Sequence, residues 1–266
     1  MKQKQANPYD VMFDGLTKQL LEVKDVDKLL DTPGGKRFIE FISVCQYEMN
    51  GLIAFYKKVI IPAINRNSVE QLQLWRQSRY SRTINIVEDH FREDKFMMIR
   101  LAYVQLYHRY ESFINGLLTH CEQLSETPSY PPGTLYDYIT TKLEVDLKRP
   151  SYHQTLKEVN FVANCVKHTN GLPTRSSPPE RFRESNKTIA IRIPDAELYN
   201  DIKAIRILMA QIIQHVLHVH MFLLLRDIGA DRTNPLQFLS SLAVSLSEAS
   251  LHEEFRSFRD FYKCSS

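Results

Sequence analysis

Residues Glu158 to Pro173, EVNFVANCVKHTNGLP, place amide, ammonium and imidazole groups at the end of a short helical pattern. At about 100° of rotation per residue, the polar side chains of residues 153 to 168 share one arc of this helix. They are His153, Lys157, Asn160, Asn164, Lys167 and His168, and they face away from Leu156, Val159, Ala163 and Val166. Because the polar arc contains no acid, the pattern favours an anionic ligand.

The last turn of this helix carries the groups that metal-independent RNA cleavage requires. His168 can transfer a proton, while the neighbouring Lys167 holds a phosphate and stabilises negative charge in the transition state. The alternative is structural: lysine and histidine complement the negative end of the helix dipole, Gly171 ends the helix, and the polar face is solvated. The pattern alone leaves both interpretations open.

The same stretch resembles the HEPN superfamily of small helical domains. EVNFVANCVKHTNG is preceded by the helical segment RLAYVQLYHRYESFINGLL and followed by a loop, a short strand pattern and a long helix, so that the resemblance covers roughly residues 90–228. Members of this family carry an arginine, a following polar residue that is often asparagine, and a histidine five residues after the arginine. Asn164 matches the polar position and His168 the histidine, while Ala163 stands at the arginine position.

The resemblance implies a homodimeric, metal-independent endoribonuclease of a bacterial toxin or phage-defence type. In catalytic members, arginine and histidine side chains from two protomers form a composite site. Here His168 would be the general acid or base, Asn164 would orient it or the phosphate, and Lys167 or Arg175 would supply the cation. The alternative is a non-catalytic HEPN-like module that binds a protein or nucleic-acid partner, and Ala163 favours it because lysine does not replace the bidentate guanidinium.

The 18-residue loop TNGLPTRSSPPERFRESN follows this helix and contains several arginines. A loop of this length is more often functional than a plain connector. We therefore expect further contacts to RNA from the loop and from the preceding helix. The expected nucleic-acid-binding residues are Lys157, Asn160, Arg175, Arg181 and Arg183.

Three histidines lie close together in HVLHVH, near the end of the long helical pattern. His215 and His218 share a face at a spacing of three residues, which is compatible with two ligands of a metal ion. A metal site needs further ligands, and the sequence offers no evident cysteine or acidic partner for His215, His218 or His220. We therefore predict no metal site and no cofactor.

The chain as a whole predicts an all-α fold, because glycines are few and apolar residues recur every three or four positions. Helices are expected over residues 8–31, over 36–64 with a kink at Pro62, over 86–124 as the central helix, over 134–143, and from 194 to 227. The segment TIAIRI, residues 188–193, alternates like a strand and suggests one short β-hairpin. The predicted organisation is an N-terminal helical extension, residues 1–85, followed by a HEPN-like bundle, residues 86–266.

Composition places few limits on function. The 34 basic and 31 acidic residues give a net charge of only +3, so any contact with RNA must use a local patch. The four cysteines form no CxxC pair, which argues against a zinc ribbon or a disulfide scaffold. The continuous apolar runs, such as VIIPAI and MFLLL, are too short to cross a bilayer. We expect a cytoplasmic protein without a membrane segment.

Overall fold

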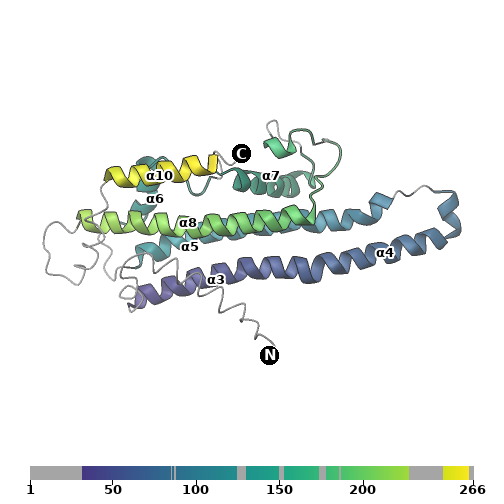
Figure 1. Ribbon diagram of the computed structural model, residues 1–266, viewed down its shortest axis with the longest axis horizontal. Coiled ribbons are helices and arrows are strands. Elements are labelled where there is room, and N and C mark those ends of the chain that lie inside the picture. Colours follow the sequence, from purple (N-terminus) through teal and green to yellow (C-terminus); the bar gives the residue numbers. More distant parts are fainter. Residues whose placement is uncertain are drawn as a thin grey trace, which may run out of the picture. The chain divides into compact units, whose positions relative to one another are not determined.

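The computed structural model describes residues 32–84, 86, 88–124, 130–149, 153–173, 178–185, 187–227 and 248–263. The predicted all-α class is confirmed, since helices account for the regular structure of this part of the chain (Figure 1). The α-helices are α3 (Pro33–Phe55), α4 (Ile61–Gln77), α5 (Glu93–Glu122), α6 (Thr134–Thr141), α7 (Gln154–Thr169), α8 (Asp195–Asp227) and α10 (Glu248–Lys263). Short helical turns are η1 (Tyr56–Ile60), η2 (Arg79–Arg82), η3 (Glu88–Arg92) and η5 (Glu180–Phe182). The predicted helix over residues 8–31 lies outside the described residues.

The expected β-hairpin at residues 188–193 is wrong. The second half of this segment alternates in burial, since Ile191 and Ile193 are buried and Arg192 between them is exposed. It has no strand partner within the described residues, and the amide of Ile191 instead donates to the carbonyl of Gly171 at 2.9 Å. Alternating burial therefore reflects a single extended connection into α8 rather than a sheet.

A π-helical turn joins α3 to α4 where the sequence predicts a kink. The turn η1 precedes Pro62, which occupies the first turn of α4, and the amide of Ile61 bonds to the carbonyl of Tyr56. Proline lacks an amide donor, and its ring clashes with the carbonyl four residues earlier in a regular α-helix. The wider π turn relieves this clash, so that the helix continues beyond the proline.

The chain forms two compact units, each built from separate stretches. Unit 1 comprises Met1–Gln46, Ser112–Tyr152 and Leu208–Ser266, and unit 2 comprises Tyr47–Glu111 and His153–Ile207. Helices α3, α5 and α8 each contribute residues to both units.

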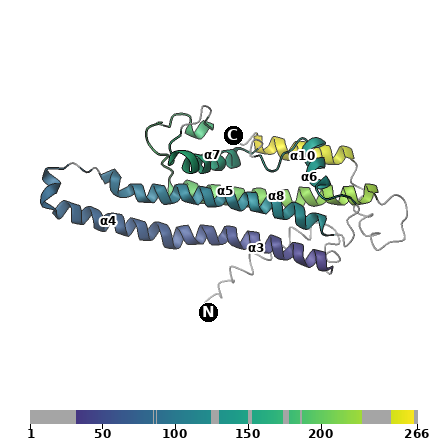
Figure 2. The ribbon, with the colours of Figure 1, turned by 180° about the vertical axis from the view of Figure 1, so that it is seen from behind.

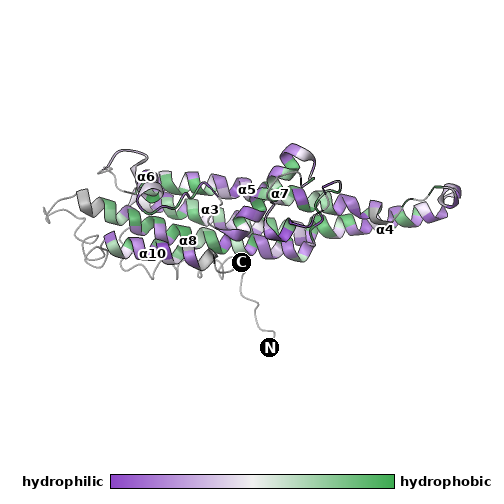
Figure 3. Ribbon diagram, turned by 90° about the horizontal axis from the view of Figure 1, so that it is seen from above, coloured by the Kyte–Doolittle hydropathy of each residue, from purple (hydrophilic) through white to green (hydrophobic). Residues whose placement is uncertain are grey.

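The core of each unit follows the helical periodicity of the sequence. In unit 2, α5 buries Ile99, Tyr103, Leu106 and Tyr110 almost completely, and in unit 1 it buries Phe113 and Leu117. Apolar and polar residues accordingly alternate along the helices in Figure 3. A side chain on such a stripe stabilises the fold by roughly 1.5–3 kcal/mol through loss of contact with water.

Helix α8 is a core helix that contains a long apolar segment. Its residues Asp195–Leu223 are long and apolar enough to cross a membrane by length and composition, but half of the most apolar window is buried inside the protein. A core helix of a soluble protein has these properties as well. The sequence gives no uninterrupted apolar run of this length, because polar residues are spaced along α8.

Substitution by alanine at two helical glycines is expected to change the stability in opposite directions. A Cβ atom on Gly116 of α5 would lie 2.5 Å from Cε2 of Phe41, whereas a Cβ on the exposed Gly51 of α3 would meet nothing within 4 Å. The Phe41 ring also stacks on His120, with 4.6 Å between ring centroids, which restricts its movement. We expect Gly116→Ala to lower the free energy of unfolding by about 1–3 kcal/mol through overpacking.

The matched control is Gly51→Ala, which should raise the free energy of unfolding by roughly 0.5–1 kcal/mol because alanine loses less backbone entropy on folding. Urea denaturation followed by circular dichroism measures both changes. Equal stabilisation by the two alanines would show that Phe41 does not pack on Gly116.

Candidate functional site

Helix α7 of unit 2 is capped at both ends. The N-terminal cap is a side chain, and the C-terminal cap is made by residues with left-handed backbone conformations. His153 is the N-cap, and its Nδ1 accepts a hydrogen bond from the amide of Leu156 at 3.2 Å. At the other end, Asn170 and Gly171 adopt left-handed conformations, and the amide of Gly171 donates to the carbonyl of Cys165 at 2.9 Å. The amide of Asn170 also donates to the carbonyl of Cys165, so two amides after the last turn satisfy one of the carbonyls at the helix end. The predicted end of the helix at Gly171 is confirmed.

His153 is therefore not part of an exposed polar face, as the helical projection suggested. Its side chain is buried, and burial lowers its pKa to about 4. The imidazole stays neutral at pH 7, which leaves the lone pair on Nδ1 that the cap requires. His153 is a structural residue.

The inner face of α7 is broad and holds the helix in unit 2. Its buried residues are Leu156, Glu158, Val159, Phe161, Val162, Ala163 and Cys165. Phe161 stacks on Phe182 of η5, with ring centroids 5.4 Å apart. Ala163 is completely buried, so the position that corresponds to the HEPN arginine points into the core of unit 2.

The outer face of α7 keeps most of the residues that the sequence predicts for it. Lys157, Lys167 and His168 are exposed, while Asn160 and Asn164 are partly buried. The amide of Asn164 donates to the side-chain oxygen of Asn160 at 2.7 Å. The ammonium of Lys167 lies 5.9 Å from the ring centroid of Tyr107 on α5, a helix that runs beside α7 in Figures 1 and 2.

No carboxylate in the described part of the chain pairs with the three exposed outer-face groups, Lys157, Lys167 and His168. The side chain of His168 also makes no hydrogen bond to another described residue. The structure therefore brings His168, Asn164 and Lys167 onto one face without linking them to each other by hydrogen bonds. Such a face can bind an anion through two cations and an imidazole.

The loop arginines have different environments. Arg175 lies outside the described residues. Arg183 forms an ion pair with Glu180 in which both side chains are more than half exposed. Arg181 is enclosed by carboxylates, so its guanidinium is already engaged within unit 2.

The carboxylates around Arg181 come from α7 and α8. Its Nη1 lies 3.1 Å from Oε2 of Glu158 and 2.8 Å from Oδ2 of Asp201, and its Nη2 pairs with Glu197. The hydroxyl of Tyr103 on α5 donates to the same Asp201 oxygen. The sequence did not reveal this cluster, because its members are separated by 20 residues or more in most pairs and only the fold brings them together.

Two members of this cluster, Tyr103 and Arg181, keep their protonation states near neutral pH. Burial raises the pKa of Tyr103, and the adjacent Asp201 carboxylate raises it further. Burial alone would lower the pKa of Arg181, but Asp201 and Tyr103 outweigh that effect and raise it. The phenol therefore remains a hydrogen-bond donor and the guanidinium remains charged. This is the chemistry of a structural ion cluster rather than of a proton-transfer site.

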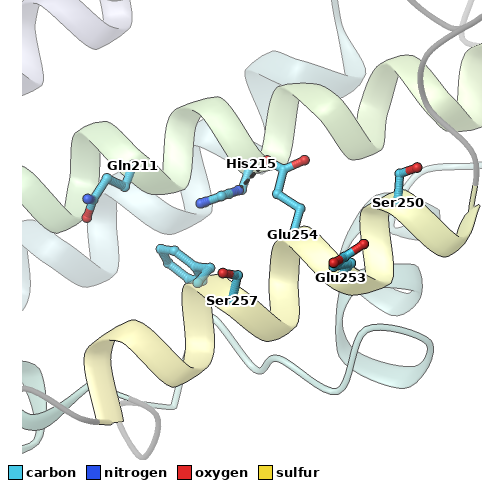
Figure 4. A pocket seen from close by; sticks show the side chains of 7 residues that line it. Gln211, His215, Ser250, Glu253, Glu254 and Ser257 are labelled. Atoms are coloured by element: carbon cyan, nitrogen blue, oxygen red, sulfur yellow. Dashed lines mark hydrogen bonds and ion pairs between the residues drawn. The ribbon is translucent and has the colours of Figure 1, made fainter.

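A second group of polar side chains lies in unit 1, between α8 and α10 (Figure 4). His215 and His218 both contact one oxygen of Glu254, which supplies the acidic partner that the sequence pattern did not reveal. His220 differs: it is buried, its Nδ1 bonds with the hydroxyl of Tyr130, and burial lowers its pKa to about 3. Among the described residues, His215 and His218 are the histidines whose donor atoms lie close enough to a carboxylate oxygen of Glu254 to share a metal ion with it.

Comparison with models of known families, with curated proteins and with solved structures gives no match. The HEPN resemblance therefore rests on the α7 residues themselves. Asn164 and His168 carry it on the outer face, and Ala163 departs from it on the inner face.

We expect a large loss of stability when the cation of the Arg181 cluster is removed. Arg181→Gln leaves Glu158 and Asp201 largely buried without a counter-charge, and removing one partner of a buried pair typically costs about 3–5 kcal/mol. Arg183→Gln is the matched control, since it breaks an exposed pair worth at most about 1 kcal/mol. Chemical denaturation should separate the two variants clearly. Similar small losses would mean that the cluster does not stabilise unit 2.

Because His153 caps α7 as a neutral imidazole, we expect the stability of the protein to depend on pH. The pKa of His153 is about 4 in the folded protein and about 6.5 when unfolded, so the unfolded state binds more protons between these values. Its contribution to stability is fully present above pH 6.5 and is lost as the pH falls toward 4. We expect a loss of about 2 kcal/mol between pH 7 and pH 5 from this residue.

His153→Asn tests this prediction, because asparagine caps helices well and does not titrate. The free energy of unfolding of the variant should fall less steeply from pH 7 to pH 5 than that of the wild type. The same slope in both proteins would contradict a buried neutral imidazole at the cap.

Proposed function

We propose that this protein binds RNA through the outer face of α7, as a HEPN-like module. The observation that supports the proposal is the composition of that face: two lysines and a histidine are exposed, and no described carboxylate neutralises them. Phosphate groups provide the missing negative charge. Asn160 and Asn164 add amide groups that can donate to or accept from sugars and bases.

The position of the aromatic ring of Tyr107 also favours RNA. The phenol belongs to α5, and its ring lies under the Lys167 ammonium at the edge of the outer face. It is largely buried, so it holds the lysine in place rather than stacking on a base. Lys167 is thus better ordered than a lysine on an open surface, which reduces the entropy lost when it contacts a phosphate.

RNA binding by these lysines predicts a specific salt dependence. Replacing one lysine that neutralises a phosphate reduces the slope of log affinity against log salt concentration by about 0.7 for a single strand. Lys157→Gln combined with Lys167→Gln should therefore weaken binding severalfold and reduce that slope by about 1.4. Fluorescence anisotropy of a labelled single-stranded RNA of mixed sequence measures both quantities.

The matched control replaces two exposed lysines elsewhere in unit 2, Lys57→Gln with Lys58→Gln, which removes the same charge from η1. It should leave the affinity close to that of the wild type. If both double variants bind equally well, or if the wild type binds no RNA, the outer face of α7 is not an RNA-binding surface. Binding of a protein partner would then be the remaining function of a HEPN-like module.

Cleavage of the bound RNA is a second candidate function, favoured by the environment of His168. Its imidazole is exposed, has no hydrogen-bond partner among the described residues, and shares the outer face with Lys167. It is therefore free to exchange a proton with a ribose hydroxyl or a leaving oxygen. Since position 163 is buried and holds alanine, the second cation would come from another copy of the chain, in line with the predicted homodimer and a toxin or phage-defence role.

If the protein cleaves RNA with His168, we expect the wild type to cleave RNA in excess EDTA and His168→Ala not to cleave it. The substitution should leave the melting temperature unchanged within about 1–2 °C, since His168 makes no packing contribution on the exposed face. Denaturing gel electrophoresis of the RNA gives the result. Equal cleavage by both proteins would exclude His168 from catalysis.

A further inference from the structure

Three side chains of unit 1 converge where α10 packs against α8. Oε1 of Glu254 lies 2.6 Å from Nδ1 of His215 and 2.8 Å from Nδ1 of His218. One donor atom from each of the three residues lies within 4.8 Å of the others. We propose that His215, His218 and Glu254 bind a divalent transition-metal ion, and that zinc is the ion best suited to them.

The rings are held in place before any ion arrives. His215 and His218 are separated by three residues of one continuous helix, so their side chains leave α8 on the same face. The His215 ring packs against Phe255 and Phe258 of α10, with centroid distances of 5.3 Å and 4.4 Å. A site whose ligands are already oriented loses little entropy when it binds a metal.

The donor set is one that zinc commonly uses. Two imidazole nitrogens and one carboxylate oxygen give three protein ligands and leave a fourth position for water. The three side chains are only 16%, 21% and 27% exposed, and His215 and Glu254 line a pocket that opens to solvent and supplies an entry path (Figure 4). The net charge of the ion with one carboxylate is +1, which suits a partly exposed site.

Gln211 adds a buried hydrogen-bond acceptor to this region of unit 1. It lies one turn before His215 and lines the same pocket. Its Oε1 is buried and has no hydrogen-bond donor among the described residues. A buried acceptor without a donor is costly, and a water molecule beside it would satisfy it.

The carboxylate of Glu254 must move away from both rings to hold the ion. In the observed geometry each Nδ1–H donates to the carboxylate of Glu254. Ligand atoms at about 2.0–2.1 Å from a tetrahedral zinc ion are separated by about 3.3 Å, so the carboxylate needs to withdraw by roughly half an ångström. On binding, each imidazole carries its proton on Nε2 and offers the Nδ1 lone pair to the ion. No oxidation or covalent change is involved.

Zinc titration of the full-length, tag-free protein tests the proposal. The protein is first stripped with a chelator and then titrated with Zn²⁺ in competition with a chromophoric indicator. We expect saturation at about one equivalent per chain, and Co²⁺ in place of zinc should give the visible absorption of a four-coordinate site. No stoichiometric uptake by the wild type would overturn the proposal on its own.

Two variants assign the site to these residues. His218→Gln and Glu254→Gln should each abolish saturable binding, while His252→Gln, a partly buried histidine on α10 outside the cluster, should bind as the wild type does. Circular dichroism establishes that the variants are folded, and His218→Gln decides the outcome if Glu254→Gln unfolds. Binding that is unchanged in His218→Gln would overturn the assignment. RNA binding by α7 is measured separately, so a failure of either proposal leaves the other standing.

Discussion

The partly buried cation of Arg181 is the interaction on which unit 2 depends most. Its guanidinium joins η5 to carboxylates of α7 and α8, and Asp201 extends the contact to the hydroxyl of Tyr103 on α5. Removing charges from water is costly, and the cost is offset only when every charged group finds partners with good geometry. The three helices and the loop must therefore occupy one arrangement to satisfy the cluster. Stacking of Phe161 on Phe182 supports the same arrangement through apolar contact.

This arrangement determines what α7 exposes. Glu158 and Ala163 face inward, so the only acidic residue of the helix pairs with Arg181 and position 163 lies in the core. Lys157, Lys167 and His168 remain outside without described carboxylate partners. The positive character of the outer face is thus a consequence of burying the negative charge. The proposed binding of RNA follows from this separation of charge, whereas the proposed cleavage additionally requires a second cation from another copy of the chain.

The sequence was sufficient for the helical class, the end of α7 and the stripe of α5, because these follow from local periodicity and from left-handed residues such as Gly171. It was insufficient where contacts join distant segments. Arg181 resembles any loop arginine until α8 brings Asp201 to it, and Glu254 becomes a neighbour of His215 only when α10 packs on α8. The extended residues 188–193 were assigned to a hairpin because alternating burial has the same pattern with or without a partner strand.

RNA binding by α7 is tested by photochemical crosslinking of a 4-thiouridine-substituted RNA to the wild-type protein, followed by mass spectrometry of the crosslinked peptides. We predict that crosslinks concentrate in residues 157–168, on the outer face of α7, and that they weaken as the salt concentration is raised. Crosslinks confined to other parts of the chain, or none at low salt, would contradict this binding surface.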